Sequence, residues 1–253
     1  PFSLQAPHFA IRLTHVRQFS KCDNGGCAVS RPHYLEIYPV TKTKSTVEQI
    51  RARFDADVER FSNLETGVTA QVDSALCLEL IAASAAATIP QAQAVLDVGC
   101  GAGNYTVKLL QHLPTLNCTL LDLSRPMLDR AQQRAAAATN GTVQTIQGDV
   151  REVELGDRQF DLILASTVLH HLRADSEWEL VYGKLYRALR PGGMLYIYDM
   201  ITHELPAIDA DMVRRFGAYL TGLKGEAYRD HVLGYIDDED TPRSLGYQMG
   251  VAL

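Results

Sequence analysis

Three glycines and an acid stand close together in the stretch VLDVGCGAGNYT. Gly99, Gly101 and Gly103 follow an apolar run and precede a helix-compatible stretch, and glycine lets a backbone turn tightly and approach a ligand closely. Asp97 lies two residues before the first glycine, where its carboxylate would repel a pyrophosphate and attract a cationic amino group. Asn104 occupies the place of the third glycine of a G-x-G-x-x-G dinucleotide turn. The spacing therefore favours a ligand that carries an ammonium group over a dinucleotide.

The sequence around this turn alternates between strand-like and helical stretches. Helical stretches at 104–113, 126–138 and 177–189 separate the strand-like runs AVLDVG, CTLLDL, TVQTIQ, FDLILAS and GMLYIYDM. This succession predicts parallel strands joined by right-handed crossovers. Runs that are apolar on both faces, such as DLILAS, are typical of central strands covered by helices on both sides. The pattern predicts an α/β fold with a doubly wound, mostly parallel sheet.

The segments outside this region are predicted to be mainly helical. A helix is expected over 45–64, with Ser45 or Thr46 as its cap, and an alanine-rich helix over 69–88. Residues 201–224 also have a helical pattern, and a final helix is expected to begin near Thr241. Between them, residues 229–244 contain the acidic run DDED and are predicted to form a loop with a solvated surface cluster.

The glycine stretch resembles the first motif of class I S-adenosylmethionine-dependent methyltransferases. LLDLS, QGDV, FDLILASTVLHHL and LRPGGMLYIYDM resemble the later landmarks of that family, in the same order, over residues 94–200. The resemblance implies a Rossmann-like methyltransferase fold, with S-adenosylmethionine as cofactor and S-adenosylhomocysteine as product. It also divides the chain into an N-terminal extension with lid helices at 1–88, a cofactor-binding core at 89–200, and a substrate-side helical segment at 201–253.

The resemblance implies roles for individual residues of the core. Asp122 corresponds to the acid that binds both ribose hydroxyls, since a carboxylate can accept two hydrogen bonds at once. Leu123 would lie against the adenine, Asp149 would bind the adenine amino group, and the Val150 amide would reach a ring nitrogen. Asp149 has an alternative role as a cap of the following turn. The full cofactor set implied is Asp97, Gly99, Cys100, Gly101, Gly103, Asp122, Leu123, Met127, Asp149, Val150 and Ser166.

Methyl transfer from a sulfonium needs alignment and exclusion of water, while a dedicated base is optional. His170 and His171 follow the fourth predicted strand and are the candidates for a general base, with packing or a backbone hydrogen bond as the alternative for either. Further candidates follow the fifth strand, at Asp199, His203 and Glu204.

Residues outside the core are expected to close the site and to shape the acceptor pocket. Phe54, Asp55 and Phe61 are candidates for a lid, although their spacing also suits an ordinary amphipathic helix. The segment after the fifth strand commonly forms the acceptor side in the family, and here it contributes Arg214, Arg215, Tyr219 and Lys224.

The family fold ends with an antiparallel strand hairpin that has no evident counterpart in this sequence. The alternating segments at 9–15 and 34–40 are expected to cover the edge of the sheet instead. An uncovered edge invites pairing with another chain, so a homodimer is possible on this pattern.

Composition narrows the classes of protein and partner. The chain has 253 residues, 46% hydrophobic composition and five cysteines, with no long apolar run or leader pattern, which predicts a cytoplasmic protein with reduced thiols and no membrane span. A net charge of −6 disfavours a broad nucleic-acid interface. Cys22, Cys27 and His33 fall short of the four ligands of a structural zinc, so no metal site is expected. The leading function is methyl transfer to a small molecule; the alternatives are an RNA modifier of the tRNA-modifier type and a cofactor-binding homologue without catalysis.

Overall fold

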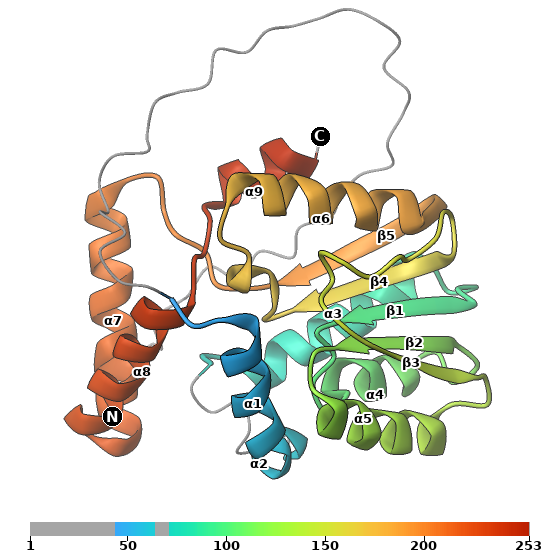
Figure 1. Cartoon of the computed structure of the whole chain (residues 1–253), viewed down its shortest axis with the longest axis horizontal. Coiled ribbons are helices and arrows are strands. Elements are labelled where there is room, and N and C mark those ends of the chain that lie inside the picture. The colour runs from blue at the N-terminus through green and yellow to red at the C-terminus, as the bar shows by residue number, and fades with distance from the viewer. Residues whose placement is uncertain (1–43, 64–70, 253) are drawn as a thin grey trace, which may run out of the picture.

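The computed structural model describes residues 44–63 and 71–252, and within them five parallel strands form one sheet in the order β3-β2-β1-β4-β5 (Figure 1). The register pairs Val98 with Leu121 on one side and with Ala165 on the other, so the carboxyl ends of the central strands meet at one edge. The strands are β1 (Ala94–Val98), β2 (Asn117–Asp122), β3 (Val143–Gln147), β4 (Phe160–Ser166) and β5 (Leu189–Tyr198).

Helices cover both faces of the sheet, which confirms the doubly wound arrangement. One face carries α3 (Ser74–Thr88), α4 (Asn104–Leu110) and α5 (Arg125–Ala138), whose buried side chains join a core cluster with Val95 and Leu120. The other face carries α6 (Asp175–Ala188) and α9 (Leu245–Ala252), which pack with Leu96 and Ile163. β4 contributes side chains to both clusters, as expected for a central strand.

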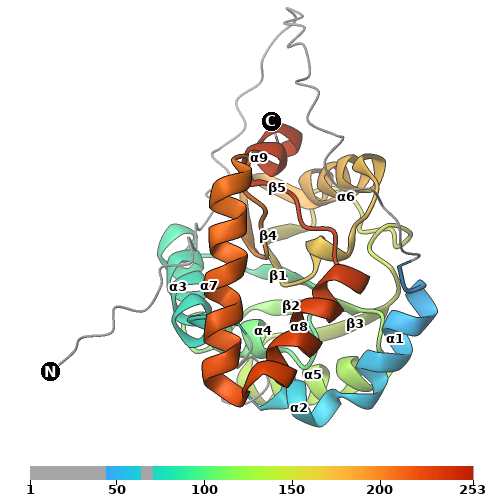
Figure 2. The same ribbon diagram turned by 90° about the vertical axis from the view of Figure 1, so that its left-hand side faces the viewer.

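The remaining helices lie at the carboxyl edge of the sheet. They are α1 (Val47–Ala56), α2 (Val58–Ser62), the short 3₁₀ helix η1 (Leu169–His171), α7 (Pro206–Lys224) and α8 (Glu226–Glu239). Figure 2 looks onto this edge, with α7 and α8 crossing in front of the strands, α2 below them and α1 at their lower right. Arg53 links α1 to α8, because its guanidinium lies 4.6 Å from the centre of the Tyr235 ring and 3.1 Å from Glu239.

The largest difference from the sequence prediction concerns residues 229–244, for which the predicted loop was wrong. Most of this segment belongs to α8, and the final helix α9 begins only at Leu245. α8 packs along α7, where a Cβ on Gly217 would make ordinary van der Waals contact with the Arg229 and Leu233 side chains. The helix is therefore stabilised by packing against α7, a contact that the charge run in the sequence does not reveal.

The predicted helix over 45–64 also differs, because it is broken into α1 and α2 at Asp57. Thr46 caps α1 through a reciprocal capping box with Gln49, so the predicted cap is present. Cys22, Cys27, His33 and the segments 9–15 and 34–40 lie outside the described residues. None of the helices in the described ranges has the length and apolar character to cross a membrane.

Candidate active site

The glycine turn joins β1 to α4, and all three of its glycines have positive φ angles, of 63°, 50° and 80°. A Cβ on Gly99 would lie 2.4 Å from the Val168 side chain, and one on Gly103 would lie 3.1 Å from Ala131. A Cβ on Gly101, in contrast, would meet no described atom within 4 Å. Two of the glycines are therefore required for packing, while Gly101 leaves backbone open at the strand edge.

Asp122 ends β2 beside this turn and is fixed by two backbone amides. The Gly101 N–H donates to Oδ2 and the Ser124 N–H donates to Oδ1, each at 2.8 Å. Burial raises the pKa of Asp122, although these amide hydrogen bonds oppose the shift. The carboxylate is thus held in one orientation and keeps lone pairs for further donors.

Asp97 lies deeper, at the end of β1, with only 1% of its surface exposed. The Thr106 hydroxyl donates to its Oδ2 at 2.5 Å. Burial raises the pKa of Asp97 to about 7, and the negative charge of Asp122 adds to the shift. A cation placed nearby would favour its ionised form.

Asp149 follows β3 and is engaged by Arg151. The Arg151 backbone N–H donates to Asp149 Oδ1 at 2.9 Å, which is the turn-capping role foreseen as the alternative, and the guanidinium pairs with the same carboxylate and with Glu177. Burial opposes ionisation, but the hydrogen bonds from Arg151 hold the pKa of Asp149 below its ordinary value. Val150, the next residue, and Leu123, which follows β2, are both partly buried.

Three further members of the predicted cofactor set are buried. Met127 and Cys100 pack inside, with 1% and 8% exposure, and burial raises the pKa of the Cys100 thiol. Ser166 ends β4, and its buried hydroxyl has no hydrogen-bond partner among the described residues. Thr167 follows with a φ of 54°, which is a strained backbone conformation for a β-branched residue.

The helices predicted to form a lid, α1 and α2, are tied to the helices that follow β1 and β2. The Ser124 hydroxyl donates to Asp55 at 2.6 Å, and the Asn104 side chain donates to the Phe61 carbonyl at 2.9 Å. Phe54 packs against Phe61 and lies edge-on to His171, with ring centres 5.6 Å and 6.1 Å apart. The three predicted lid residues therefore all lie at the carboxyl edge.

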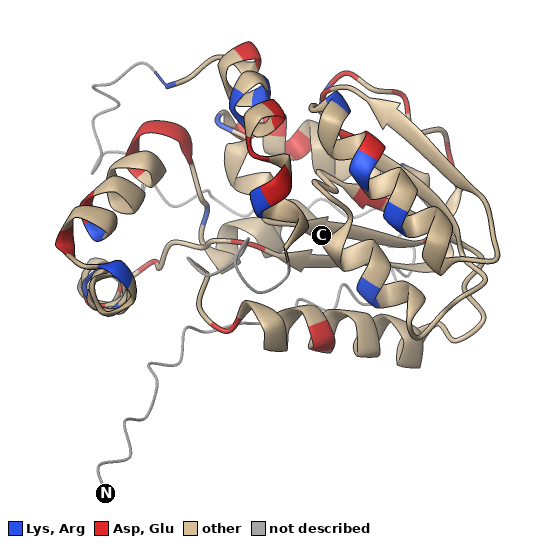
Figure 3. Cartoon of the chain, turned by 90° about the horizontal axis from the view of Figure 1, so that it is seen from below, with Lys and Arg blue, Asp and Glu red and all other residues tan. Residues whose placement is uncertain are grey.

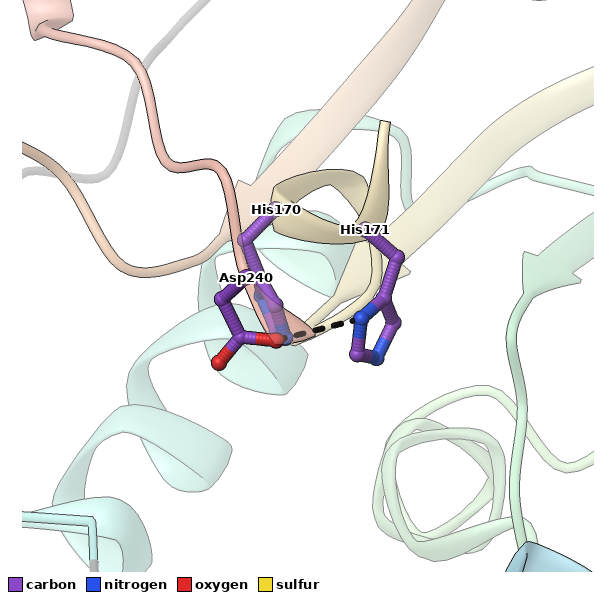
Figure 4. Close-up of side chains that lie close together, drawn as sticks. All are labelled: His170, His171 and Asp240. Atoms are coloured by element: carbon purple, nitrogen blue, oxygen red, sulfur yellow. Dashed lines mark ion pairs between the residues drawn. The ribbon is translucent and has the colours of Figure 1, made fainter. Parts of the chain in front are cut away.

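His170 and His171 belong to η1, directly after β4. Asp199, at the end of β5, accepts the Leu169 N–H at 2.7 Å and the His170 N–H at 3.2 Å, and its carboxylate also contacts His170 Nδ1. Asp240 approaches from the segment after α8, with its Oδ1 atom 3.2 Å from His171 Nδ1 and 3.7 Å from His170 Nε2 (Figure 4).

Asp240 is a site residue that sequence reasoning missed. The run DDED was predicted to be solvated, yet Glu239 and Asp240 are each only 5% exposed, which corrects that prediction for these two residues. The run lies at the end of α8, drawn in red in Figure 3. No local signal marks Asp240, because the histidines that it faces lie on a distant segment.

Most of the other predicted acceptor-side residues have structural partners. Arg214 and Arg215 are exposed and pair with Asp211 on α7. His203 pairs with Asp209, and Glu204 accepts the Gly246 N–H at 3.1 Å. Lys224 lies over the Tyr228 ring, whereas Tyr219 stacks on Phe216.

Two tyrosines that were not predicted line the same edge near Ser166. Tyr105 is the second residue of α4 and Tyr198 ends β5, and their ring centres are 6.2 Å apart. Burial raises the pKa of both hydroxyls, so both are neutral donors at physiological pH. The strand edge therefore combines open backbone, fixed acids, aromatic rings and a histidine pair.

A parallel α/β sheet with a glycine turn after β1 and an acid at the end of β2 defines a Rossmann-like nucleoside-binding class of protein. Residues 95–193 match the methyltransferase domain family. This match confirms the resemblance to class I S-adenosylmethionine-dependent methyltransferases that the motifs predicted.

The matching relatives have names that specify different activities. The chain is 32% identical over 113 residues to an uncharacterized methyltransferase of Mycobacterium tuberculosis, covering 45% of this chain and 53% of that one. It is 32% identical over 148 residues to a carboxy-S-adenosyl-L-methionine synthase of Wolinella succinogenes, covering 57% and 60%. A malonyl-[acyl-carrier protein] O-methyltransferase of Priestia megaterium is 30% identical over 126 residues, covering 50% and 43%. The chain thus spans about half the length of the curated relatives it matches.

Solved structures share the fold. The [4+2]-cyclase SpnF matches with a TM-score of 0.54 at 15% identity, over 77% of this chain and 90% of that one. A protein of Pyrococcus horikoshii matches with a TM-score of 0.52 at 18% identity, over 72% and 81%. These likenesses describe the architecture alone, which supports more than one chemistry.

Proposed function

We propose that this chain binds S-adenosylmethionine at the carboxyl edge of the sheet and catalyses methyl transfer to a small-molecule acceptor. The observation that carries the proposal is the placement of Asp122, which two backbone amides fix beside the open backbone of Gly101. When bound, S-adenosylmethionine supplies an electrophilic methyl group on a sulfonium with a good leaving group.

The residues present fit this cofactor. The open backbone at Gly101 leaves room for a ligand where a side chain would intrude. The buried Ser166 hydroxyl has no described partner and offers a hydrogen bond at the next strand end. Asp122 offers acceptors for two ribose hydroxyls, and Asp97 offers a carboxylate for an ammonium group once it is ionised.

The predicted adenine side consists of Leu123, Asp149 and Val150, together with the buried support of Met127 and Cys100. We propose that Asp149 binds the adenine amino group with lone pairs that remain while Arg151 holds its carboxylate. Gly99 and Gly103 act by allowing the turn to pack.

We propose that residues 89–200 bind the cofactor, that α1 and α2 cover it, and that α7 and α8 form the acceptor side. The position of α1 and α2 against Ser124 and Asn104 supports the lid role. His170 and His171 are the candidates for accepting a proton from the acceptor, since they lie at the end of β4, next to the strand ends that would hold the cofactor.

The acceptor class is proposed from two observations. The relatives named above include enzymes whose names specify a carrier-bound malonyl group and a derivative of S-adenosylmethionine. Acidic and basic residues are interspersed along the helices in view in Figure 3, and the net charge of the chain is −6. Both features of the charge disfavour a broad nucleic-acid interface and so favour a small-molecule acceptor. The prediction against a nucleic-acid partner, the RNA-modifier alternative and the homodimer all stay predictions of the sequence. The three described cysteines are free and buried, which supports the proposed cytoplasmic location.

Calorimetry with S-adenosylmethionine and S-adenosylhomocysteine tests the cofactor site. Two lost hydrogen bonds to a carboxylate, at about 1.5–3 kcal/mol each, predict that Asp122→Ala weakens both ligands about a hundredfold or more. Asp129→Ala, at an exposed position on α5, is the matched control and is expected to bind normally. Thermal melting checks folding, because Asp122 also anchors Gly101 and Ser124. Unchanged affinity in folded Asp122→Ala contradicts the proposal.

Turnover is tested separately by measuring S-adenosylhomocysteine release with a panel of small carboxylic acids, amines and hydroxyl compounds, and with RNA. Product formed with a small molecule supports methyl transfer of the proposed class. Tight cofactor binding without turnover on any acceptor favours the non-catalytic alternative, and turnover on RNA alone favours the RNA modifier.

A further inference from the structure

His170, His171 and Asp240 bring three potential metal ligands together at the end of β4 (Figure 4). One ring nitrogen of each histidine and one carboxylate oxygen all lie within 4.8 Å of one another. Bonds of about 2.0–2.2 Å to a common ion would place neighbouring ligand atoms about 3–3.5 Å apart. The separations of 3.2 Å and 3.7 Å from Asp240 Oδ1 to the two histidines are close to this range.

The same atoms lack ordinary hydrogen bonds. Asp240 Oδ1 and His171 Nδ1 are both buried, and neither has a partner with hydrogen-bond geometry among the described residues. The side chain of Asp240 is only 2% exposed, so its charge is shielded from water. Asp240 Oδ1 lies at ion-pair distance from the two imidazoles, at 3.2 Å and 3.7 Å, but makes no hydrogen bond to them. A buried carboxylate without hydrogen bonds is costly, and a cation bound between these three groups would offset that cost.

The surroundings orient the ligands in the way that metal sites require. Asp199 contacts Nδ1 of His170, which leaves Nε2 as the free nitrogen on the side of Asp240. A carboxylate on the second ring nitrogen is the usual partner of a metal-binding histidine. Asp199 is itself fixed by the backbone N–H groups of Leu169, His170 and Met200. Lys44 donates to the backbone carbonyl of Asp240 and not to its carboxylate. The carboxylate oxygen Oδ1 therefore faces the two histidines.

We propose that His170 Nε2, His171 Nδ1 and Asp240 Oδ1 bind a divalent transition-metal ion. Two imidazoles and one carboxylate suit Zn²⁺ and its neighbours in the first transition row better than Mg²⁺ or Ca²⁺, which prefer oxygen ligands. Three protein ligands leave at least one coordination position open. His171 is the most accessible ligand, with 18% of its side chain exposed, and it marks the side from which an ion can enter.

The metal site is separate from the proposed cofactor site, because none of its ligands belongs to the predicted cofactor set, but it shares His170 and His171 with the proposed proton-accepting role. With an ion bound, His170 and His171 no longer offer free lone pairs. The proton-accepting role proposed above therefore applies to the metal-free protein.

Zinc titration of the chelator-treated, untagged full chain tests this site by calorimetry. The protein carries Cys22→Ser and Cys27→Ser, so that the N-terminal cysteines cannot supply ligands. We expect one ion per chain, and Asp240→Asn should weaken binding at least tenfold because it removes the charge while keeping the shape. Asp237→Asn, exposed near the end of the same helix, is the control and should bind as the parent does.

Cobalt substitution provides a second readout, since Co²⁺ bound to nitrogen and oxygen ligands has a visible absorption band that the free ion shows only weakly. His171→Ala, at a partly exposed position, should lose this band. This variant replaces Asp240→Asn in the test if Asp240→Asn does not fold. S-adenosylhomocysteine binding is measured in parallel and should persist in both variants, which separates this proposal from the cofactor site. Absence of binding by the parent protein, or equal zinc affinity of the parent and the folded variants, overturns the proposal.

Discussion

The two halves of the carboxyl edge are built in different ways. At β1 and β2 the contacts come from backbone amides of one continuous stretch, with Gly101 only 21 residues before the Asp122 carboxylate that it binds. At β4 and β5 the contacts come from side chains of three separate segments, namely η1, the end of β5 and the end of α8. The first half therefore depends on backbone shape, and the second on the packing of distant helices.

The difference indicates which half of the edge can stay the same across a domain family and which half can vary from one protein to another. A backbone turn presents the same N–H groups whatever the acceptor is, which suits a shared cofactor. A side chain delivered from the end of α8, such as Asp240, can be replaced without disturbing the sheet. The family match covers residues 95–193, which contain the first half and stop before Asp199 and Asp240.

The largest expected effect is on stability, at the point where the halves touch. Gly99→Ala places a Cβ 2.4 Å from Val168 at a φ of 63°, so strain and overpacking together should lower the free energy of unfolding by about 2–4 kcal/mol. Gly192→Ala is the matched control, because its φ is 83° and no described atom lies within 4 Å of the added Cβ. It should cost only about 1–2 kcal/mol. Equal losses in urea denaturation would show that Val168 does not restrain the turn.

A smaller effect concerns the protonation of Asp97. Its pKa of about 7 means that the free protein is largely protonated there at pH 6, while an ammonium ligand requires the carboxylate. S-adenosylhomocysteine affinity should therefore rise about fivefold from pH 6 to pH 7, as the fraction of ionised Asp97 increases. Asp97→Asn should bind more weakly and lose this rise. Calorimetry at pH 6 and pH 7 measures this affinity. The same affinity at both pH values in the parent protein would show that Asp97 does not bind the ammonium group of the ligand.

The lid contact between Asp55 and Ser124 should have an effect of about 1 kcal/mol. Asp55→Ala removes the acceptor of the Ser124 hydroxyl and should loosen α1, which limited proteolysis at residues 44–63 can detect. Glu48→Ala, exposed on the same helix, should leave the cleavage rate unchanged. Similar cleavage of both variants would mean that the hydrogen bond does not hold the lid.

The smallest effect is expected for Arg215, which was predicted to lie on the acceptor side. Arg215→Ala should leave both the thermal midpoint and the acceptor KM unchanged, because an exposed ion pair contributes little. A clear rise in KM would extend the acceptor side to the exposed face of α7.

The two halves of the carboxyl edge also differ in how well the sequence predicts them. The alternation of strands and helices between residues 94 and 200 predicted the parallel sheet, because each element there has its own apolar pattern and a local turn. The prediction was wrong for residues 229–244, since α8 is stabilised by α7 and the acidic run conceals its buried end at Asp240. His170, His171 and Asp199 were singled out from the sequence, each as a separate candidate. Asp240, the other carboxylate that the histidines face, was not, because only tertiary packing brings the end of α8 to them.

The most direct test of the account is a crystal structure of the chain with S-adenosylhomocysteine. We expect the ligand to lie across the carboxyl edge, with its ribose hydroxyls on Asp122 and its amino acid end beside Gly101 and Asp97. Density for the ligand elsewhere, or a site that stays empty at saturating ligand with Asp122 bonded only to Gly101 and Ser124, would contradict it.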